Sequence, residues 1–207
     1  MSQNLIQMVE SVCDALISQS DYLNELDSVM GDGEHGSNIK KCFSLIKAQL
    51  PQWSQQKDSE MLGSIGMKLL SAGGGTATTL MGYALMRLST HLIDKNMSDE
   101  KILSVALQET LIEVQNRSKA QIGDKTLMDA LIPGIEAFRE AVDAGEPISG
   151  CFKKCAEQAE LGAEKTKELI AHRGRGLYVG ERGIGVPDPG ATSISIIAKT
   201  ICENINQ

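Results

Sequence analysis

Three acidic side chains lie close together in the glycine-rich segment LDSVMGDGEHGSN, which begins at residue 26. Asp27, Asp32 and Glu34 provide carboxylate oxygens, the type of ligand that Mg²⁺ prefers in proteins. The glycines at 31 and 33 disfavour a continuous helix, because glycine costs about 1 kcal/mol relative to alanine in a helix interior. A turn there lets the three carboxylates converge. The segment therefore predicts a hard-cation site, with a solvated acidic turn as the alternative; its spacing does not match an EF-hand calcium loop.

A second glycine-rich segment, SAGGGTATTLMG, carries glycines at 73 to 75, followed by hydroxyl groups on Thr76, Thr78 and Thr79. Glycines expose backbone N–H groups, and the N-terminus of the helix that follows favours an anion. A phosphate group therefore fits this segment. It is not a P-loop, because no Gly-Lys-Ser/Thr sequence follows the glycines. A flexible connector is the alternative interpretation.

The segment GDKTLMDAL begins a helix, with Asp124 or Thr126 as the expected cap. The side chain of Lys125 is expected in solvent in preference to a contact with phosphate. On its own, this third segment predicts only a helix start.

The longest irregular segment, HRGRGLYVGERGIGVPDPGATS, starts at residue 172 and contains Arg173, Arg175 and Arg182. Guanidinium groups bind phosphate through charge-assisted hydrogen bonds, so three arginines among glycines form a candidate phosphate clamp. The DPG tripeptide near its end leads into a helix, whose N-terminus is a further place for an anion. A flexible surface loop is the alternative interpretation.

Apolar side chains at helical spacing predict about eight helices, and no strand-like alternation stands out. Aromatic residues make up only 3% of the chain, so the core must be aliphatic, which suits packed helices better than a sheet sandwich. Ser98 is the expected N-cap of the fifth helix. We expect one all-α domain over residues 1–207, with helices over 4–23, 38–50, 58–70, 76–93, 98–114, 126–144, 147–171 and from 189 onward.

Four segments carry the candidate chemistry and form the first to fourth loops: 27–38, 71–79, 118–125 and 172–192. They follow the first, third, fifth and seventh expected helices. In an up-and-down bundle, alternate loops fall at the same end. All four loops are therefore expected together, where their carboxylates, glycines and arginines match a Mg-nucleotide site.

The amino-acid composition limits the classes of binding partner and the cellular compartment that we expect for this chain. A net charge of −7 argues against nucleic acid or an anionic membrane as a partner. No apolar run approaches the roughly 20 residues that span a bilayer, and the first residues lack the basic start of a secretory signal. Five scattered cysteines without a paired framework indicate a reducing compartment, hence a cytoplasmic protein. Cys151 and Cys155 are expected to be buried thiols rather than zinc ligands.

The four segments resemble the signature blocks of the nucleotide-binding L subunit of dihydroxyacetone kinase, in the same order and over essentially the whole chain. The resemblance implies a barrel of eight antiparallel helices with ADP or ATP and two Mg²⁺ ions at one end. The implied metal ligands are Asp27, Asp32 and Glu34. The implied nucleotide contacts are His35, Gly36, Ser37, Asn38, Thr76, Ala77, Ser118, Leu127, Arg175, Asp188, Pro189 and Gly190.

The chain departs from the family's pattern in three of these positions. Glu34 stands where the family usually has aspartate, and Leu127 replaces the methionine beside adenine. Ala77 replaces a serine that faces phosphate, so Thr76 or Thr78 would have to supply that hydroxyl. These departures suggest a divergent paralogue that retains metal and nucleotide binding.

The resemblance implies a phosphotransferase subunit that passes a phosphoryl group to a short keto sugar held on a separate K subunit. The donor would be free ATP, or an M subunit of a phosphotransferase system that recharges bound ADP. No catalytic side chain is expected from this chain. Because some family members contact a transcription regulator, the alternative is a nucleotide-sensing partner that transfers no phosphate. A homodimer is the expectation for its own oligomeric state.

Overall fold

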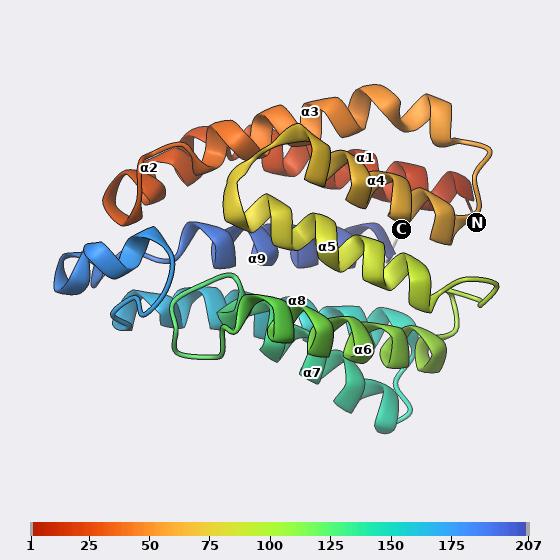
Figure 1. Cartoon of the computed structure of the whole chain (residues 1–207). Coiled ribbons are helices and arrows are strands. Elements are labelled where there is room, and N and C mark those ends of the chain that lie inside the picture. Colours follow the sequence, from red (N-terminus) through yellow and green to blue (C-terminus); the bar gives the residue numbers. More distant parts are fainter. Residues whose placement is uncertain (1, 206–207) are drawn as a thin grey trace.

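The computed structural model describes residues 2–205, with side chains from residue 4 onward. That part of the chain contains nine α-helices, three short 3-10 helices and no strand (Figure 1). The α-helices are α1 (Ser2–Ser18), α2 (Ser20–Met30), α3 (His35–Trp53), α4 (Asp58–Ala72), α5 (Gly75–His91), α6 (Glu100–Ser118), α7 (Met128–Asp143), α8 (Ile148–Lys165) and α9 (Pro189–Ile205). The 3-10 helices are η1 (Thr166–Glu168), η2 (Arg175–Tyr178) and η3 (Gly180–Gly183). None of the described helices is long and apolar enough to cross a membrane.

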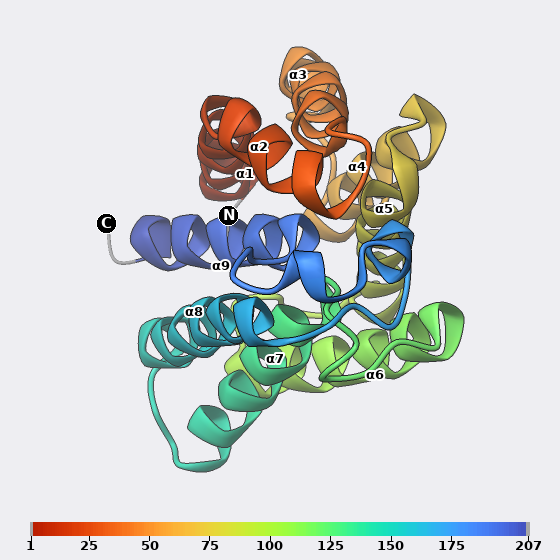
Figure 2. The same ribbon diagram turned by 90° about the vertical axis from the view of Figure 1, so that its left-hand side faces the viewer.

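Eight of the helices form a closed ring. α1 packs against α3, each helix from α3 to α8 packs against the next one in the chain, and α9 returns to α1. Neighbours in the ring run antiparallel, and Figure 2 views the ring from one end. α2 continues beyond α1 and packs against α3 and α9. The expected all-α barrel is confirmed, with α2 as an additional helix.

The first expected helix, over 4–23, is two helices that separate at Gln19. Gln19 has φ −92° and ψ 6°, outside the helical range, although neither glycine nor proline marks the break. α2 then continues to Met30, so Asp27 lies in the last turn of a helix rather than in a loop. Because α3 already begins at His35, the irregular part of the first loop shortens to residues 31–34.

Several further helix ends differ from expectation. α3 continues through Pro51 to Trp53, and α6 continues beyond 114 to Ser118. Ser98 is not the N-cap of α6; Asp99 is, because its Oδ1 accepts hydrogen bonds from the backbone nitrogens of Lys101 (2.9 Å) and Ile102 (3.1 Å). A carboxylate at the N-cap also interacts favourably with the helix dipole. α8 ends at Lys165 instead of continuing to 171, and the chain passes through η1 before the fourth loop.

The interior of the ring is aliphatic, as the composition predicted, with a small aromatic contribution. Phe138 of α7 and Phe152 of α8 contact each other edge to face, with ring centroids 4.9 Å apart. Cys151 is a buried free thiol, and Cys155 is a half-buried one. Burial raises the pKa of Cys155 to about 12, so this thiol is unreactive at neutral pH.

The crossing of α2 over α3 depends on Gly36. A Cβ atom at this position would overlap the carbonyl oxygen of Ser20 and lie 2.9 Å from the backbone nitrogen of Asn24. Backbone atoms cannot rotate aside as a flexible side chain can. We therefore expect Gly36→Ala to lower the free energy of unfolding by about 3 kcal/mol, as measured by urea unfolding.

Gly150→Ala is the control for this prediction, because Gly150 is also helical but lies under a movable side chain. The nearest atom to a Cβ there is Oε2 of Glu146, which can rotate away. Replacing a helical glycine by alanine then holds or raises stability. Equal unfolding curves for Gly36→Ala and the wild type would show that α2 and α3 do not cross this closely.

Candidate functional site

The four loops lie together at one end of the bundle, as their alternation along the chain predicted (Figure 1). Figure 2 views this end directly. The N-termini of α3, α5, α7 and α9 lie at the same end, because every second helix of the ring starts there. Helix N-termini carry unpaired N–H groups and partial positive charge. This end of the molecule therefore favours an anion.

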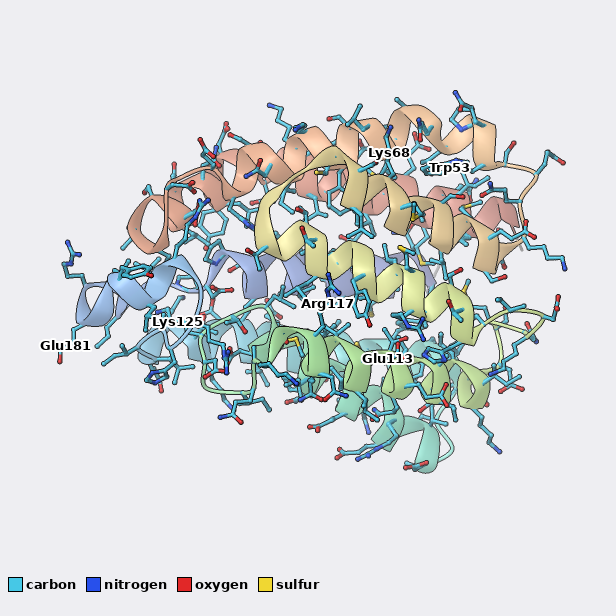
Figure 3. The ribbon with its side chains drawn as sticks, viewed as in Figure 1. Trp53, Lys68, Glu113, Arg117, Lys125 and Glu181 are labelled. Atoms are coloured by element: carbon cyan, nitrogen blue, oxygen red, sulfur yellow. The ribbon has the colours of Figure 1, made fainter. Side chains whose placement is uncertain are left out.

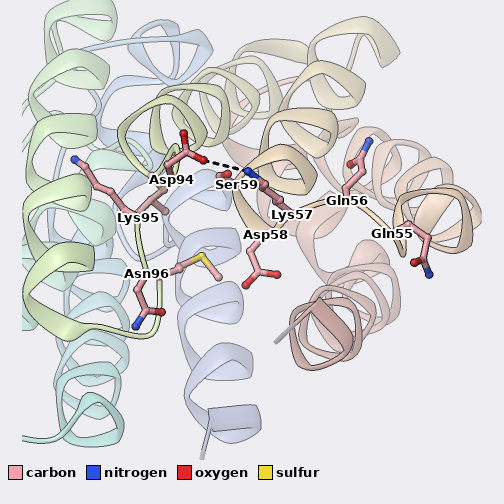
Figure 4. A pocket seen from close by; sticks show the side chains of 10 residues that line it. Gln55, Gln56, Lys57, Asp58, Ser59, Asp94, Lys95 and Asn96 are labelled. Atoms are coloured by element: carbon pink, nitrogen blue, oxygen red, sulfur yellow. Dashed lines mark hydrogen bonds and ion pairs between the residues drawn. The ribbon is translucent and has the colours of Figure 1, made fainter.

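A hollow of about 590 Å³ lies at the opposite end, between residues 55–59 and 92–97 (Figure 4). Lys57 and Asp94 form an ion pair of 3.1 Å across it, and both side chains are largely exposed. Exposed pairs of this kind contribute little binding or folding energy. Because the candidate ligand residues are all at the other end, the four loops define the site.

Asp27 joins the end of α2 to the start of α3. Its side chain is buried, and its Oδ2 accepts hydrogen bonds from the backbone nitrogens of Glu34 and His35, each at 3.0 Å. A Cβ at Gly31 would overlap Oδ1 of Asp27, so glycine leaves room for the carboxylate. Asp27 thereby pairs N–H groups that the first turn of α3 leaves without an intrahelical partner.

Asp32 connects the first loop to the fourth loop through an ion pair with Arg175. Partial loss of hydration acts to raise the pKa of Asp32, but the Arg175 guanidinium and a contact with the Asp27 carboxyl hold that pKa below its ordinary value. Asp32 is therefore ionised at neutral pH. The guanidinium neutralises a charge that a divalent cation could also neutralise.

The donor chemistry of the first loop fits Mg²⁺, because two neighbouring aspartates and an exposed glutamate offer oxygen ligands. The three carboxylates do not yet converge: over residues 2–205, no three His, Cys, Asp or Glu side chains are grouped to hold a metal ion. Asp27 caps α3, and Asp32 is paired with Arg175. The assignment of Asp27, Asp32 and Glu34 as ligands therefore stays a prediction, and it requires Asp32 to leave Arg175.

His35 links the start of α3 to the start of α9. Its Nε2 lies 2.8 Å from the hydroxyl oxygen of Ser193, and that hydroxyl donates to the carbonyl of Pro189 at 3.0 Å. Since Ser193 has one hydroxyl proton, His35 Nε2 must be the donor to Ser193 Oγ. Burial lowers the pKa of His35, which agrees with a neutral ring. Ser193 is the last residue of the irregular segment that starts at residue 172, but it is not among the predicted nucleotide contacts.

The rest of the first turn of α3 faces α2 and the second loop. Ser37 exchanges two hydrogen bonds with the Asn24 side chain, each 2.9 Å. The Nδ2 atom of Asn38 lies 3.9 Å from the position of a Cβ at Gly75, whose φ of +82° favours glycine. The first and second loops are therefore adjacent at these residues.

The structure of the second loop distinguishes Thr76 from Thr78, the two threonines that could supply the hydroxyl of the family's serine. Thr78 is fully buried, and its hydroxyl donates to the carbonyl of Gly75 at 3.1 Å. Thr78 therefore cannot supply a hydroxyl to a ligand, and this part of the expectation is wrong. Thr76 is exposed in the first turn of α5 and remains the candidate. The hydroxyl of Thr79 also donates to Gly75, at 2.8 Å.

Three of the remaining predicted contacts meet where the third and fourth loops touch. Leu127 is buried, and its Cβ lies 3.2 Å from the position of a Cβ at Gly190. Ala77 is half-buried and packs against the apolar cluster that contains Leu127. Ser118 instead takes part in a local turn, where its hydroxyl oxygen accepts a hydrogen bond from the backbone of Ala120 at 3.2 Å.

The expected caps of α7 are only partly correct. The Thr126 hydroxyl oxygen accepts a hydrogen bond from the backbone of Met128 at 3.2 Å. The main acceptor, however, is the buried carboxylate of Asp129, which binds the backbone nitrogens of Gly123 (2.6 Å) and Thr126 (2.7 Å). The interpretation of the sequence did not single out Asp129, although Thr126 to Asp129 match the capping-box pattern, in which the fourth residue accepts a hydrogen bond from the backbone nitrogen of the first.

Lys125 is not in solvent, contrary to expectation. Its side chain is 2% exposed, and its ammonium group donates to two carbonyl oxygens of the segment that follows α8. Figure 3 labels Lys125 at the four-loop end of the molecule. Burial lowers its pKa, while the nearby carboxylates of Asp188 and Asp129 act in the opposite direction. Lys125 is therefore a buried structural cation within the site, almost fully shielded from solvent.

The three arginines do not form one clamp. Arg175 pairs with Asp32, whereas Arg173 donates to the Asp124 carboxylate at 2.8 Å. The exposed side chain of Arg182 donates only to the carbonyl of Val179, at 3.4 Å, among the described residues. Arg175 alone faces the acidic first loop.

Asp188 precedes α9 and has an unusual environment. Its Oδ2 accepts a hydrogen bond from the backbone of Ala191 at 2.7 Å, and its own backbone nitrogen donates to the Thr166 hydroxyl at 2.8 Å. Burial raises the pKa of Asp188 to about 7; Asp129 adds to this effect, and the hydrogen bond from Ala191 and the charge of Lys125 oppose it. The folded protein therefore binds a proton here that the unfolded chain releases above about pH 4.

This raised pKa predicts a pH dependence of stability. Between about pH 4 and pH 7 the folded state binds more protons at Asp188 than the unfolded state, so this group's contribution to stability falls as pH rises. Asparagine carries no charge and keeps an acceptor for the backbone of Ala191. We expect Asp188→Asn to gain on the order of 2 kcal/mol relative to wild type between pH 5 and pH 8. Parallel stability curves in urea unfolding over this range would contradict the raised pKa.

Comparison with known proteins identifies the family. Residues 29–203 match the DAK2 domain. The chain belongs to the DAK2 domain family. Two relatives are the ADP-binding subunit DhaL of PEP-dependent dihydroxyacetone kinase 2 from Listeria innocua serovar 6a (35% identical over 196 residues, 93% of this chain and 90% of that protein) and the corresponding DhaL of Escherichia coli K12 (31% over 188 residues, 91% and 90%). The named relatives of this DAK2 domain are kinases, so the chain is a kinase-type phosphotransferase component.

Solved structures share the DAK2 fold. The dihydroxyacetone kinase of C. freundii in its native form superposes with a TM-score of 0.76 at 24% identity, covering 96% of this chain and 34% of that one. The same kinase in complex with AMP-PNP and Mg²⁺ gives 0.75 at 23% identity, covering 96% and 33%. The DAK2 domain described here thus corresponds to about a third of that kinase, and at this identity the likeness establishes the fold.

Proposed function

We propose that this chain is the nucleotide-binding subunit of a dihydroxyacetone-type kinase, with ADP or ATP and Mg²⁺ at the four-loop end. The observation that carries the proposal is the coincidence of opposite charges there. Arg175 and the start of α5, whose N-cap makes no side-chain hydrogen bond, favour phosphate, and an acidic turn favours a cation. At the starts of α3, α7 and α9, the carboxylates of Asp27, Asp129 and Asp188 already accept backbone hydrogen bonds. Acidic side chains without a cation would repel the phosphates of a nucleotide, and positively charged groups alone would bind phosphate without a cation. A nucleotide with bound Mg²⁺ pairs its phosphates with the positive groups and its cation with the acidic side chains.

The residues divide by chemistry. Asp27, Asp32 and Glu34 would hold the metal, in the two-ion arrangement that the family resemblance implies. Thr76 and Arg175 would bind phosphate oxygens, together with the backbone N–H of Gly36 at the start of α3. His35, Ser37 and Asn38 already donate their backbone N–H groups to Asp27, Asn24 and Glu34, and Pro189 has no N–H to donate. Ala77 and Leu127 offer an apolar surface for the base. Bound Mg²⁺ neutralises charge on the phosphates, and the chain's own residues orient them.

No side chain of this subunit needs to act as a nucleophile. We propose that the phosphoryl group passes from bound ATP to a hydroxyl of a short keto sugar on a K-type subunit, and that the ADP left behind stays bound. An M-type phosphotransferase subunit then recharges it, which the PEP-dependent names of the two DhaL relatives support. The five free thiols agree with a reducing, cytoplasmic location.

Native mass spectrometry of the gently purified protein, followed by titration calorimetry, tests the proposal. We expect ADP to co-purify, and the stripped protein to bind one ADP in a Mg²⁺-dependent manner. Reconstitution with K-type and M-type subunits should then yield phosphorylated dihydroxyacetone. A stripped protein that binds neither ADP nor ATP in the presence of Mg²⁺ would refute the assignment.

A second candidate is a nucleotide-sensing partner without phosphoryl transfer. Ala77 has no hydroxyl, and that of Thr78 is buried, so the second loop offers less to a transferring phosphate than the family's serine does. Mg-ADP binding without transfer in the reconstituted system would favour this candidate, which would then include contact with a transcription regulator.

A further inference from the structure

An ammonium group helps to close the base of the segment that carries Arg175. Lys125 donates one hydrogen bond to the carbonyl of Leu169 (3.1 Å) and one to the carbonyl of Gly183 (2.7 Å). These two carbonyls bracket residues 170–182. A backbone hydrogen bond from Gly185 to the carbonyl of Lys167, at 2.7 Å, lies just outside them. Residues 170–182 therefore form a loop whose two ends are connected by the Lys125 side chain and by this backbone hydrogen bond.

The neighbouring residue, Asp124, binds the same loop two and three residues before Arg175. The carbonyl oxygen of Asp124 accepts a hydrogen bond from the backbone of His172 at 3.1 Å, and its Oδ2 accepts one from Nε of Arg173 at 2.8 Å. The same Oδ2 also binds the backbone nitrogen of Gln121 at 2.9 Å. Asp124 is thus held within the third loop and in turn holds the fourth.

The need to fill space in the interior does not explain why residue 125 is a lysine. Taking an ammonium group out of water is costly unless hydrogen bonds replace the lost hydration, and an aliphatic side chain would fill the same volume without that cost. Lys125 also has a backbone φ of +58°, which is unusual for a residue with a side chain. Such a conformation persists where the surrounding contacts require it. What the ammonium group adds is a fixed connection between two distant carbonyls.

We propose that Asp124 and Lys125, the loop anchor, position Arg175 for the phosphates of the bound nucleotide without touching the nucleotide themselves. This inference rests on the proposed function, since it assigns Arg175 to the phosphates. Arg175 itself is exposed and reaches the first loop only through the ion pair with Asp32. The anchor is what limits where the guanidinium can move once that pair opens.

Lys125→Met tests the anchor, because methionine keeps the length of the side chain and removes its donors. Lys119→Met is a matched control: Lys119 lies in the same loop with a similar φ of +56°, but it is exposed and its side chain makes no hydrogen bond within residues 4–205. We expect Lys125→Met to raise the Kd for Mg-ADP about tenfold and to speed amide exchange over 169–185, while Lys119→Met changes neither.

A double-mutant cycle separates positioning from general stability. If Lys125 acts through Arg175, then Lys125→Met should weaken Mg-ADP binding by less than about twofold in an Arg175→Ala background. A full tenfold loss in that background would overturn the proposal, because it would show an effect independent of Arg175. Unchanged affinity and unchanged exchange in Lys125→Met alone would also overturn it.

Arg173→Ala covers the case in which Lys125→Met does not fold. This change removes the exposed partner of Asp124 and leaves the buried lysine intact. We expect a rise in Kd of about threefold and faster exchange confined to the backbone around 172–175; no change in either would count against the anchor. Amide exchange without nucleotide tests the anchor even if the wild type binds no Mg-ADP, an outcome that would refute the proposed function alone.

Discussion

Asp32→Asn is expected to abolish the Mg²⁺ dependence of ADP binding, with a loss of affinity of at least about 100-fold. Loss of a residue that only supports a metal ligand typically costs about 10- to 100-fold, so loss of a direct ligand should cost at least as much. Asn keeps one oxygen but removes the charge that offsets the cation. Titration calorimetry with ADP at saturating Mg²⁺ measures the loss, and circular dichroism verifies that the helices are retained.

The metal-free arm of this experiment distinguishes a metal ligand from a mere partner of Arg175. Asp32→Asn also breaks the ion pair with Arg175, which frees the guanidinium for phosphate. In EDTA the variant should therefore bind ADP at least as well as the wild type. Asp21→Asn, an equal charge change in the exposed first turn of α2, is the control and should leave both arms unchanged. Intact Mg²⁺-dependent affinity in Asp32→Asn would remove Asp32 from the metal site.

The gathering of the four loops could be predicted because it depends only on the order of helices and on their antiparallel packing. Glycine or proline marks several of the helix ends, such as Gly31 after α2, Gly73 after α4 and Pro189 at the start of α9, and apolar periodicity indicates the helices between them. The alternation of the loops survived the unexpected break at Gln19, because α2 continues away from α1 toward the same end and leaves the direction of α3 unchanged. The prediction of where the loops lie is therefore unaffected by the missed boundary between α1 and α2.

The interior of the site could not be predicted, because its contacts join residues far apart in the chain. Lys125 binds carbonyl oxygens 44 and 58 positions away, and His35 contacts Ser193 across 158 positions. Every residue has a backbone carbonyl, so the sequence does not indicate which carbonyls will accept a hydrogen bond from a lysine. A lysine that will be buried therefore has the same sequence context, glycines and acidic residues, as one that stays in solvent. The choice between Thr76 and Thr78 likewise depends on which face of α5 turns inward, and one turn of helix after three glycines does not fix that face.

Arg175→Ala is the second change with a large expected effect, because Arg175 alone connects the fourth loop to the acidic turn through its side chain, among the described residues. Hydrogen bonds between charged groups are worth about 1.5–3 kcal/mol, so we expect the Kd for Mg-ADP to rise about 10- to 100-fold. A ligand at 100 times its Kd stabilises the folded state by about 2.7 kcal/mol, and a tenfold weaker Kd halves that gain. Thermal unfolding with and without Mg-ADP measures the difference.

Amide exchange of residues 169–188 decides whether Arg175 acts as a nucleotide contact or only as a surface charge. In the wild type, Mg-ADP should slow exchange over this segment, because phosphate replaces Asp32 as the partner of the guanidinium and the loop closes over it. Arg182→Ala is the matched control in the same loop, since Arg182 is exposed and bonds only to the neighbouring carbonyl of Val179 within the described chain. Its protection by Mg-ADP should equal that of the wild type, whereas Arg175→Ala should lose most of it. Equal protection in both variants would show that Arg175 is not the contact that orders the loop. Exchange that Mg-ADP leaves unchanged in the wild type would place the loop outside the nucleotide site, and the phosphates would then have to bind the other loops without it.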